Sequence, residues 1–200
     1  MNNKRNISII GGTGHVGFAL GLIFSSKGFN VSLIDVNKEN IKKVNSGKVP
    51  FLEENSQTLL KRMIRKKKIY ATNELKEVQK SKYIIVCIGT PVDKNLNPKL
   101  KSFISFFYEL KKFLRKDQIV IIRSSIYPGI CNKIYEIIKS SCSNLSYCPE
   151  RIVQSKAISE LPKLPQLVSG KSKIAINESK NLFKKVCKKI IIIEVIEAEL

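Results

Sequence analysis

The chain has 200 residues, of which 43% are hydrophobic and 26% charged, and this composition suits a folded domain with a sizeable core. No apolar stretch approaches the roughly 20 residues that cross a bilayer. The basic N-terminus runs into glycines without a cleavage site, so neither a membrane span nor a signal peptide is expected. The net charge of +20 comes mostly from lysines spread along the chain, which indicates a compositional bias more than a nucleic-acid-binding face.

Cysteine and histidine usage gives no sign of a metal site or of disulfides. The five cysteines are odd in number and show no C-x-x-C spacing, and His15 is the single histidine. We therefore expect no bound metal and a reducing, cytoplasmic environment.

Short β-branched runs alternate with longer amphipathic runs, which is typical of βαβ units around a parallel sheet. The expected strands are 7–10, 30–35, 68–72, 83–89, 118–124, 144–148, 166–170 and 189–195. The expected helices are 15–27, one that begins after the capping residue Asn37, 100–114, 129–138 and 178–187, with the basic run 61–68 as a solvated helix face. This order predicts a Rossmann-like, doubly wound α/β fold with a mainly parallel sheet and helices on both faces.

Aromatic residues gather in the expected helix 100–114. Phe103, Phe106, Phe107 and Leu110 recur at helical spacing. This spacing favours a helix face docked on the sheet over a platform for stacking nucleic-acid bases.

The first expected strand is followed by GGTGHVG, in which Gly12, Gly14 and Gly17 match G-x-G-x-x-G. The first glycine allows a tight turn, the second lets a pyrophosphate approach the backbone, and the third lets the helix pack close to the strand. The helix N-terminus then presents free amides and partial positive charge to the phosphates. The predicted cofactor-binding residues of this turn are Gly12, Thr13, Gly14, His15, Val16 and Gly17.

Asp35 ends the second expected strand, where it can accept hydrogen bonds from an adenosine ribose. A 2′-phosphate would be repelled there, so NAD is favoured over NADP, although the nearby Lys38 weakens this preference. A glycine-rich turn without a ligand is the alternative.

Three later strands end in polar segments, IGTPVD (88–93), RSSIYPG (123–129) and YCPER (147–151). Open α/β sheets bind ligands at this edge, so we expect one site there. Each segment taken alone would be interpreted as a turn.

Seven ordered motifs resemble those of the nucleotide-sugar dehydrogenases, the UDP-glucose and UDP-N-acetylmannosamine 6-dehydrogenases. They are GTGHVG with Asp35, GKVPFLEEN, YATNEL, IGTPVD, RSSIYPG, YCPERIVQ and LPQLVSG, and they cover essentially the whole chain. The sequence C-P-E-R in place of N-P-E-F-L-R-E is more similar to the UDP-N-acetylhexosamine branch. The resemblance therefore implies UDP-N-acetyl-D-mannosamine as the leading substrate, with UDP-glucose as the alternative.

The resemblance implies oxidation of a sugar C6 alcohol to a carboxylate for polysaccharide biosynthesis, with two hydride transfers to NAD⁺ and a thioester that water hydrolyses. Thr90 and Pro91 would line the nicotinamide half. Ser125 would order an active-site water and contact the cofactor, and Glu150 would position or deprotonate that water. Arg151 and Ile152 would border the nucleotide sugar.

From the residues alone, these side chains also have plain structural interpretations. Glu150 could fix a strand-end turn, Ser125 could stabilise a turn, and Arg151 could pair with a nearby acid. In the resembling family the nucleophilic cysteine lies in a second half, and none of the five cysteines here matches it.

The expected organisation is an NAD-binding domain over 1–193 and, over 194–200, the start of a helix leading to a sugar-binding half. The complete protein would be a homo-oligomer. A non-catalytic Rossmann module and a basic nucleic-acid-binding protein are the competing hypotheses.

Overall fold

The computed structural model describes residues 5–89, 100–151 and 155–200. One eight-stranded sheet has the spatial order β3-β2-β1-β4-β5-β6-β7-β8. Its strands are β1 (Asn6–Ile10), β2 (Asn30–Ile34), β3 (Ile69–Thr72), β4 (Tyr83–Val86), β5 (Ile119–Ile122), β6 (Leu145–Tyr147), β7 (Gln166–Gly170) and β8 (Ile190–Ile192). All eight expected strands are confirmed, and so is the Rossmann-like fold class.

Most neighbouring strands run parallel, but β7 runs antiparallel to β6. Ser146 pairs with Gly170 and Tyr147 with Ser169, whereas β8 is again parallel to β7. The strand order reverses between β1 and β4, and such a reversal opens a crevice at the carboxyl ends of the strands.

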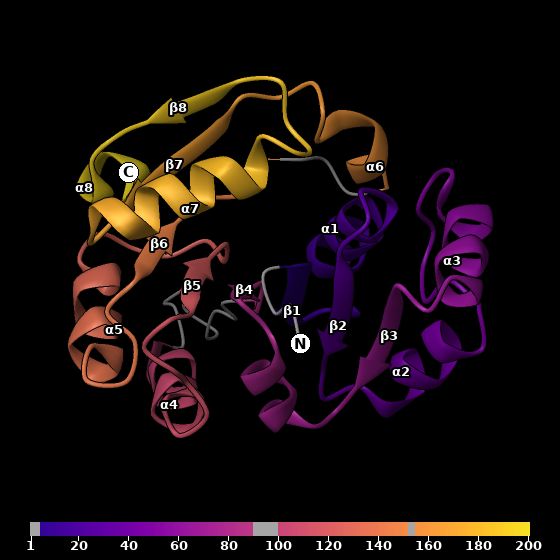
Figure 1. Ribbon diagram of the computed structural model, residues 1–200, viewed down its shortest axis with the longest axis horizontal. Helices are drawn as coiled ribbons and strands as arrows, with labels where there is room; N and C mark the ends of the chain where they lie inside the picture. The colour runs from indigo at the N-terminus through magenta and orange to yellow at the C-terminus, as the bar shows by residue number, and fades with distance from the viewer. Residues whose placement is uncertain (1–4, 90–99, 152–154) are drawn as a thin grey trace, which may run out of the picture.

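Helices cover both faces of the sheet (Figure 1). The helical segments are α1 (His15–Ser26), α2 (Lys38–Asn45), α3 (Ser56–Arg65), η2 (Leu75–Lys80), α4 (Leu100–Lys111), α5 (Ile130–Ile138), α6 (Ala157–Glu160), α7 (Lys173–Phe183) and α8 (Val195–Glu199). One apolar cluster joins the sheet to α1, α3 and α7, and a second joins its other face to α4 and α5. No helix within the described ranges is long and apolar enough to cross a membrane.

Local capping explains where two helices begin. Asn37 accepts a hydrogen bond from the Asn40 amide at 3.0 Å, so the predicted cap of α2 is confirmed. The prediction of a helix over 178–187 was wrong at both ends. The Ser172 hydroxyl accepts from the Ala175 amide at 3.1 Å, and α7 therefore begins five residues earlier than expected.

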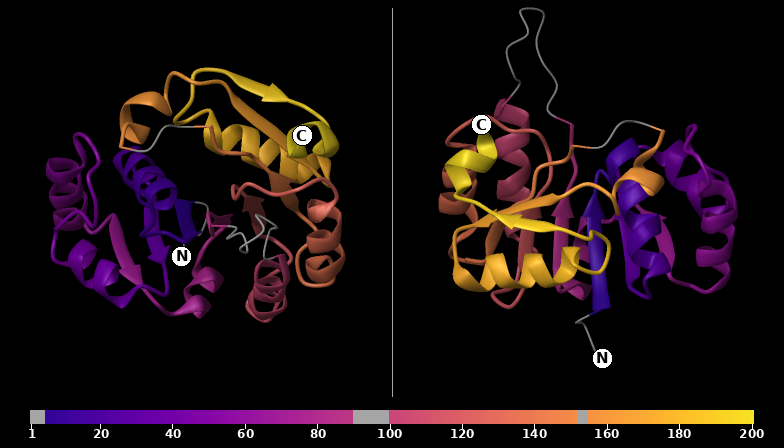
Figure 2. Two further views of the ribbon diagram at one scale, coloured as in Figure 1. Left: turned by 180° about the vertical axis from the view of Figure 1, so that it is seen from behind. Right: turned by 90° about the horizontal axis from the view of Figure 1, so that it is seen from above.

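The C-terminal edge of the central strands gathers the segments that carry the candidate site. Figure 2, seen from above, shows α1 and α6 near one another at this edge, with α5 further along the sheet. The Glu54 amide donates to the Ser155 carbonyl at 3.1 Å, and the Ile158 amide donates to the Glu53 carboxylate at 3.1 Å. Segments about 100 residues apart in the chain are thereby joined beside the start of α1.

Candidate cofactor and catalytic site

The glycine turn after β1 is built differently from the predicted assignment of roles. Gly11, with φ of +73°, holds the left-handed conformation, and not Gly12. A Cβ on Gly12 would lie 2.7 Å from the Leu33 Cα, so Gly12 allows close contact with β2. The amides of Gly11 and Gly12 both donate to the Ile34 carbonyl, at 2.9 and 3.1 Å.

Gly17 packs against the turn, whereas the sequence had indicated that it would pack against the strand. A Cβ there would lie 2.4 Å from the Gly11 carbonyl oxygen. Contact between α1 and β2 is instead allowed by Gly21, whose Cβ would lie 2.6 Å from the Leu33 side chain. The expected close packing of helix and strand exists, but a glycine one turn further along provides it.

The N-terminus of α1 carries no side-chain cap and no acidic residue in its first turn. Its N-cap residue, Gly14, is exposed, and a Cβ there would have 3.4 Å to its nearest neighbour. Helices α2 and α7, by contrast, have capping side chains on their first amides. An uncapped start with open space before it suits a phosphate group.

Asp35 lies beside this turn, as predicted. Its Oδ2 accepts the Thr13 amide at 2.9 Å and its Oδ1 accepts the Asn37 amide at 3.1 Å. These bonds fix the orientation of the carboxylate at the end of β2. A carboxylate has about four acceptor positions, so two bonds leave capacity for a ribose hydroxyl.

A cleft of about 660 Å³ opens at the carboxyl ends of β1 to β4, within the roughly 300–1,000 Å³ of small-molecule sites. Gly11, Gly14 and Asp35 line it, together with the segment that follows β4. The complete lining is Ile10, Gly11, Gly14, Ile34, Asp35, Val36, Asn73, Leu75, Cys87, Ile88, Gly89, Phe106, Glu109 and Phe113. Its size, its acid and its neighbouring helix N-terminus fit a dinucleotide.

The aromatic helix α4 has two roles. Phe103, Phe107 and Leu110 are buried against the sheet, which confirms the expected helix face. Phe106, and Phe113 just after the end of α4, are half-buried and line the cleft. Phe106 packs against the core cluster, as the sequence predicts, but helical spacing alone does not show that its ring also reaches a cavity.

The remaining turn residues lie around the start of α1. Exposed His15 stacks on Phe51, with the ring centroids 3.9 Å apart, so this aromatic contact is the observed role of its ring. Val16 is half-buried, and Thr13 is 1% exposed. The Thr13 hydroxyl has no hydrogen-bond partner among the described residues.

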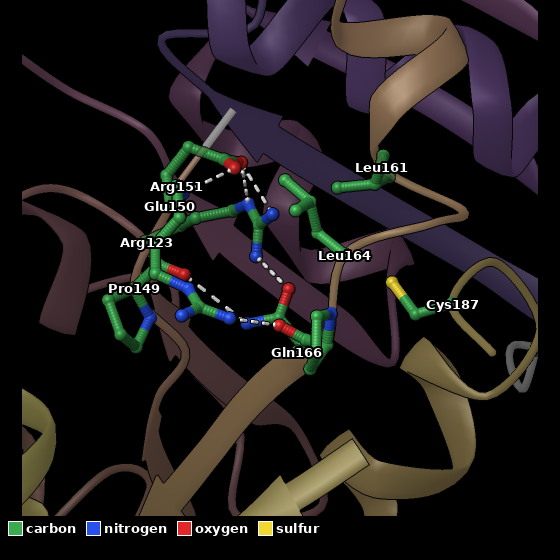
Figure 3. A pocket seen from close by; sticks show the side chains of 9 residues that line it. Arg123, Pro149, Glu150, Arg151, Leu161, Leu164, Gln166 and Cys187 are labelled. Carbon is green, nitrogen blue, oxygen red and sulfur yellow. Dashed lines mark hydrogen bonds and ion pairs between the residues drawn. The ribbon is translucent and has the colours of Figure 1, made fainter. Parts of the chain in front are cut away.

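Glu150 and Arg151 lie away from this cleft, at a second cluster. The Glu150 side chain, only 10% exposed, forms an ion pair with buried Arg123, whose Nε donates to Glu150 Oε2 at 2.6 Å (Figure 3). The Arg151 guanidinium donates to the backbone carbonyl of Pro165 and not, among the described residues, to the nearby acid that the sequence had suggested as its partner. Sequence reasoning missed Arg123, although it opens the RSSIYPG motif.

Ser125 is exposed just beyond β5, next to buried Ser124. Thr90, Pro91 and Ile152 lie outside the described residues. Of the predicted site residues that are described, Gly14 and Asp35 line one cleft, and the other residues of the glycine turn lie around it. Glu150 and Arg151 line a separate small pocket with Arg123 and Gln166.

The cysteines are poor candidates for a nucleophile. Burial raises the pKa of Cys148 to about 12 and that of Cys187 to about 11, although the Arg123 charge opposes the rise at both. Burial also raises the pKa of Cys87 to about 12, and it raises the pKa values of Cys131 and Cys142. Because the thiolate is the reactive form, the raised pKa values keep all five thiols in the less reactive protonated form near neutral pH.

Comparison with known proteins agrees with this geometry. The model of the UDP-glucose/GDP-mannose dehydrogenase family, NAD binding domain, matches residues 5–188. The UDP-N-acetyl-D-mannosamine dehydrogenase of Pyrococcus horikoshii is 25% identical over 88% of this chain and 44% of its own length. The UDP-glucose 6-dehydrogenase of Rickettsia felis is 26% identical over 90% of this chain and 40% of its own length.

A solved structure has the same fold. The UDP-D-ManNAc dehydrogenase from Pyrococcus horikoshii superposes with a TM-score of 0.90 at 25% identity, covering 97% of this chain and 48% of that one. The chain thus spans less than half the length of each of these relatives.

Proposed function

We propose that this chain, which belongs to the UDP-glucose/GDP-mannose dehydrogenase family and is a NAD-binding domain of it, is the cofactor-binding half of an NAD-dependent nucleotide-sugar 6-dehydrogenase. The observation that carries the proposal is the uncapped start of α1, which faces a cleft of dinucleotide size with Asp35 in its wall. The bound cofactor would supply hydride acceptance, and the chain would supply its placement.

In this proposal the turn residues 12–17 and Asp35 hold the cofactor. Gly14 leaves room for the pyrophosphate, and the first amides of α1 bond it. Asp35 accepts from the adenosine ribose. Thr90 and Pro91, which follow β4, contact the nicotinamide half.

The sugar side of the proposed site follows β5 and β6. Ser125 orders a water, and Glu150 positions or deprotonates it for hydrolysis. Arg151 and Ile152 border the nucleotide sugar. The nucleophilic thiol comes from a second half of the enzyme, in accord with the raised pKa values of Cys148 and Cys187.

The favoured reaction is oxidation of UDP-N-acetyl-D-mannosamine to its uronate. The C-P-E-R sequence at residues 148–151 and the Pyrococcus horikoshii relative support it. UDP-glucose is the second candidate, because the Rickettsia felis relative is similar at an equal level of identity. Measuring NAD⁺ reduction by the complete enzyme with each sugar decides between them.

The wider setting of the protein is also part of the proposal. Five free thiols accord with a cytoplasmic enzyme of polysaccharide biosynthesis. The complete protein is proposed to be a homo-oligomer, which sedimentation of that protein would test.

NADH fluorescence titration tests the cofactor site directly. Asp35→Ala should weaken NADH binding, because it removes the acceptor for the ribose. Glu150→Gln should leave NADH affinity nearly unchanged, because Glu150 does not line the cleft. If both variants lose NADH equally, the proposed role of Glu150 is wrong.

Two alternatives predict other results. A non-catalytic nucleotide-binding module would bind NADH but would have no sugar-oxidising partner half encoded in frame or nearby. A nucleic-acid-binding protein would show DNA or RNA affinity that falls steeply as salt rises. Absence of such binding at low salt would remove the second alternative.

A further inference from the structure

Arg123 is the largest side chain among those that the structure buries fully. An isolated buried charge costs several kcal/mol, and apolar replacements of buried ion pairs are often neutral or stabilising. The strand before it, β5, reads IVII and is buried throughout. Stability alone therefore gives little reason for arginine at the end of this strand.

The contacts of Arg123 show what the guanidinium holds. Besides Nε, its Nη2 contacts Glu150 Oε2, and its Nη1 donates to Gln166 Oε1 at 2.8 Å and to the Cys148 carbonyl at 3.2 Å. Its carbon Cζ lies 5.1 Å from the centroid of the Phe183 ring. One rigid group thus joins the ends of β5, β6 and β7.

The same network reaches the backbone on both sides of Glu150. Gln166, which Arg123 orients, donates from Nε2 to the Pro149 carbonyl at 3.3 Å. The Arg151 amide donates to Glu150 Oε1 at 2.7 Å. Hydrogen bonds therefore hold residues 148–151 at two carbonyls, one carboxylate and one amide.

We propose that Arg123 is a positioning residue, which sets the orientation of Glu150 for its work on water in the sugar oxidation. What Glu150 does there rests on the proposed function, whereas the positioning does not. A planar guanidinium can hold a carboxylate and an amide oxygen in one fixed geometry, and the single charged nitrogen of lysine cannot. A misplacement of about 1 Å at a reacting group can cost about 100-fold in rate.

Hydrogen exchange of the Arg151 amide tests the positioning on this chain. Arg123→Lys keeps the charge and removes the fork, and it should speed exchange of this amide about tenfold or more, because its acceptor Glu150 is no longer held. The matched control is Arg115→Lys. Arg115 forms a partly exposed ion pair with Asp117 at 3.0 Å, just before β5 begins and at the other end of the strand from Arg123. This substitution should leave the exchange rate of the Arg151 amide unchanged. Equal exchange in Arg123→Lys and the unaltered chain would overturn the proposal.

A second variant keeps the test decisive if Arg123→Lys fails to fold. Gln166→Ala removes one partner of Arg123 and the bond to the Pro149 carbonyl without stranding a buried charge. It should speed exchange of the Arg151 amide about threefold while the amides of β1 stay protected. No change in that variant would contradict the network.

Kinetics of the complete enzyme separate positioning from plain stability. Arg123→Lys should lower kcat about tenfold or more and leave the KM for NAD⁺ within about twofold, because the cofactor cleft is built without Arg123. An unchanged kcat would refute the role. If the unaltered enzyme oxidises no nucleotide sugar, the proposed function fails, and the Arg151 amide still decides whether Arg123 positions Glu150.

Discussion

Substitution by alanine should have different consequences at two glycines of the same turn. Gly14 and Gly17 lie three residues apart in G-x-G-x-x-G, but their surroundings differ. At Gly14 an added Cβ would stand 3.4 Å from its nearest neighbour, on the open side of the cleft. At Gly17 it would stand 2.4 Å from one carbonyl oxygen of the turn, inside the closest contact that atoms tolerate. Gly14→Ala should damage binding, and Gly17→Ala should damage the fold.

The expected sizes follow from these contacts. Gly17→Ala overpacks a backbone contact at 2.4 Å, which costs about 3 kcal/mol, against about 1 kcal/mol regained from helix propensity, so the net loss is about 2 kcal/mol. Gly14 has φ of −80°, which alanine adopts readily. There the poorer N-cap costs about 0.5–1 kcal/mol, and the reduced entropy of the unfolded chain returns about 0.4–1 kcal/mol. The net change in unfolding free energy for Gly14→Ala is therefore near zero.

Urea unfolding and NADH titration of both variants test this pair. Gly14→Ala should unfold at the midpoint of the unaltered chain but bind NADH about tenfold or more weakly, a loss of about 1.4 kcal/mol. Gly17→Ala should unfold at clearly lower urea. If Gly14→Ala bound NADH as tightly as the unaltered chain, the pyrophosphate would not approach this backbone. Equal stabilities would show that the turn yields to the added methyl of Gly17→Ala.

Three further outcomes concern stability. Burial raises the pKa values of Cys148 and Cys187 from 9.0 to about 12 and about 11, so above about pH 9 the unfolded chain loses these protons first and stability falls. Each thiol should remove on the order of 1 kcal/mol by about pH 10, and the slope of the urea midpoint between about pH 8 and about pH 10 should flatten in a variant with alanine at both positions. A midpoint with the same slope in both would contradict this. Glu199 accepts two amides at the start of α5, both at 2.8 Å, so Glu199→Ala should cost about 1–2 kcal/mol in urea unfolding, whereas exposed Glu136→Ala should cost under about 0.5 kcal/mol. Asn37→Ala should cost about 1 kcal/mol through loss of the α2 cap, and thermal unfolding at an unchanged temperature would count against that cap.

Local chemistry explains which parts of the site could be predicted. Glycines, a strand-end acid and a helix start carry their signal within about 25 residues, so the turn and Asp35 were located from the sequence. The structural role of each glycine could not be predicted in the same way. The motif G-x-G-x-x-G begins at Gly12, yet Gly11, just before the motif, takes the left-handed conformation, while Gly12 lies against Leu33 of β2.

Contacts between residues far apart in the chain could not be predicted from the sequence either. The lining of the cleft by Phe106 and Phe113 depends on where α4 crosses the edge of the sheet. Glu150 was recognised from its motif, but its partner Arg123 was not. An arginine at the end of an apolar strand is ordinarily interpreted as a surface residue, and nothing near it in the chain indicates a buried acid.

The antiparallel direction of β7 accounts for the arrangement that local patterns could not give. Strand periodicity is the same in either direction, so the sequence predicts a strand at 166–170 without its orientation. Because β7 is antiparallel to β6, with Ser146 paired to Gly170, its first residue, Gln166, lies by the end of β6, where it meets Arg123 and the Pro149 carbonyl. A parallel β7 would bring its other end there. The cofactor cleft is formed by β1 to β4 and α4, and the Arg123 network by the ends of β5, β6 and β7. Damage to one should therefore leave the other intact. A variant that releases Glu150 from Arg123 should keep its NADH affinity. A variant with a side chain added in the glycine turn should keep the Arg151 amide protected.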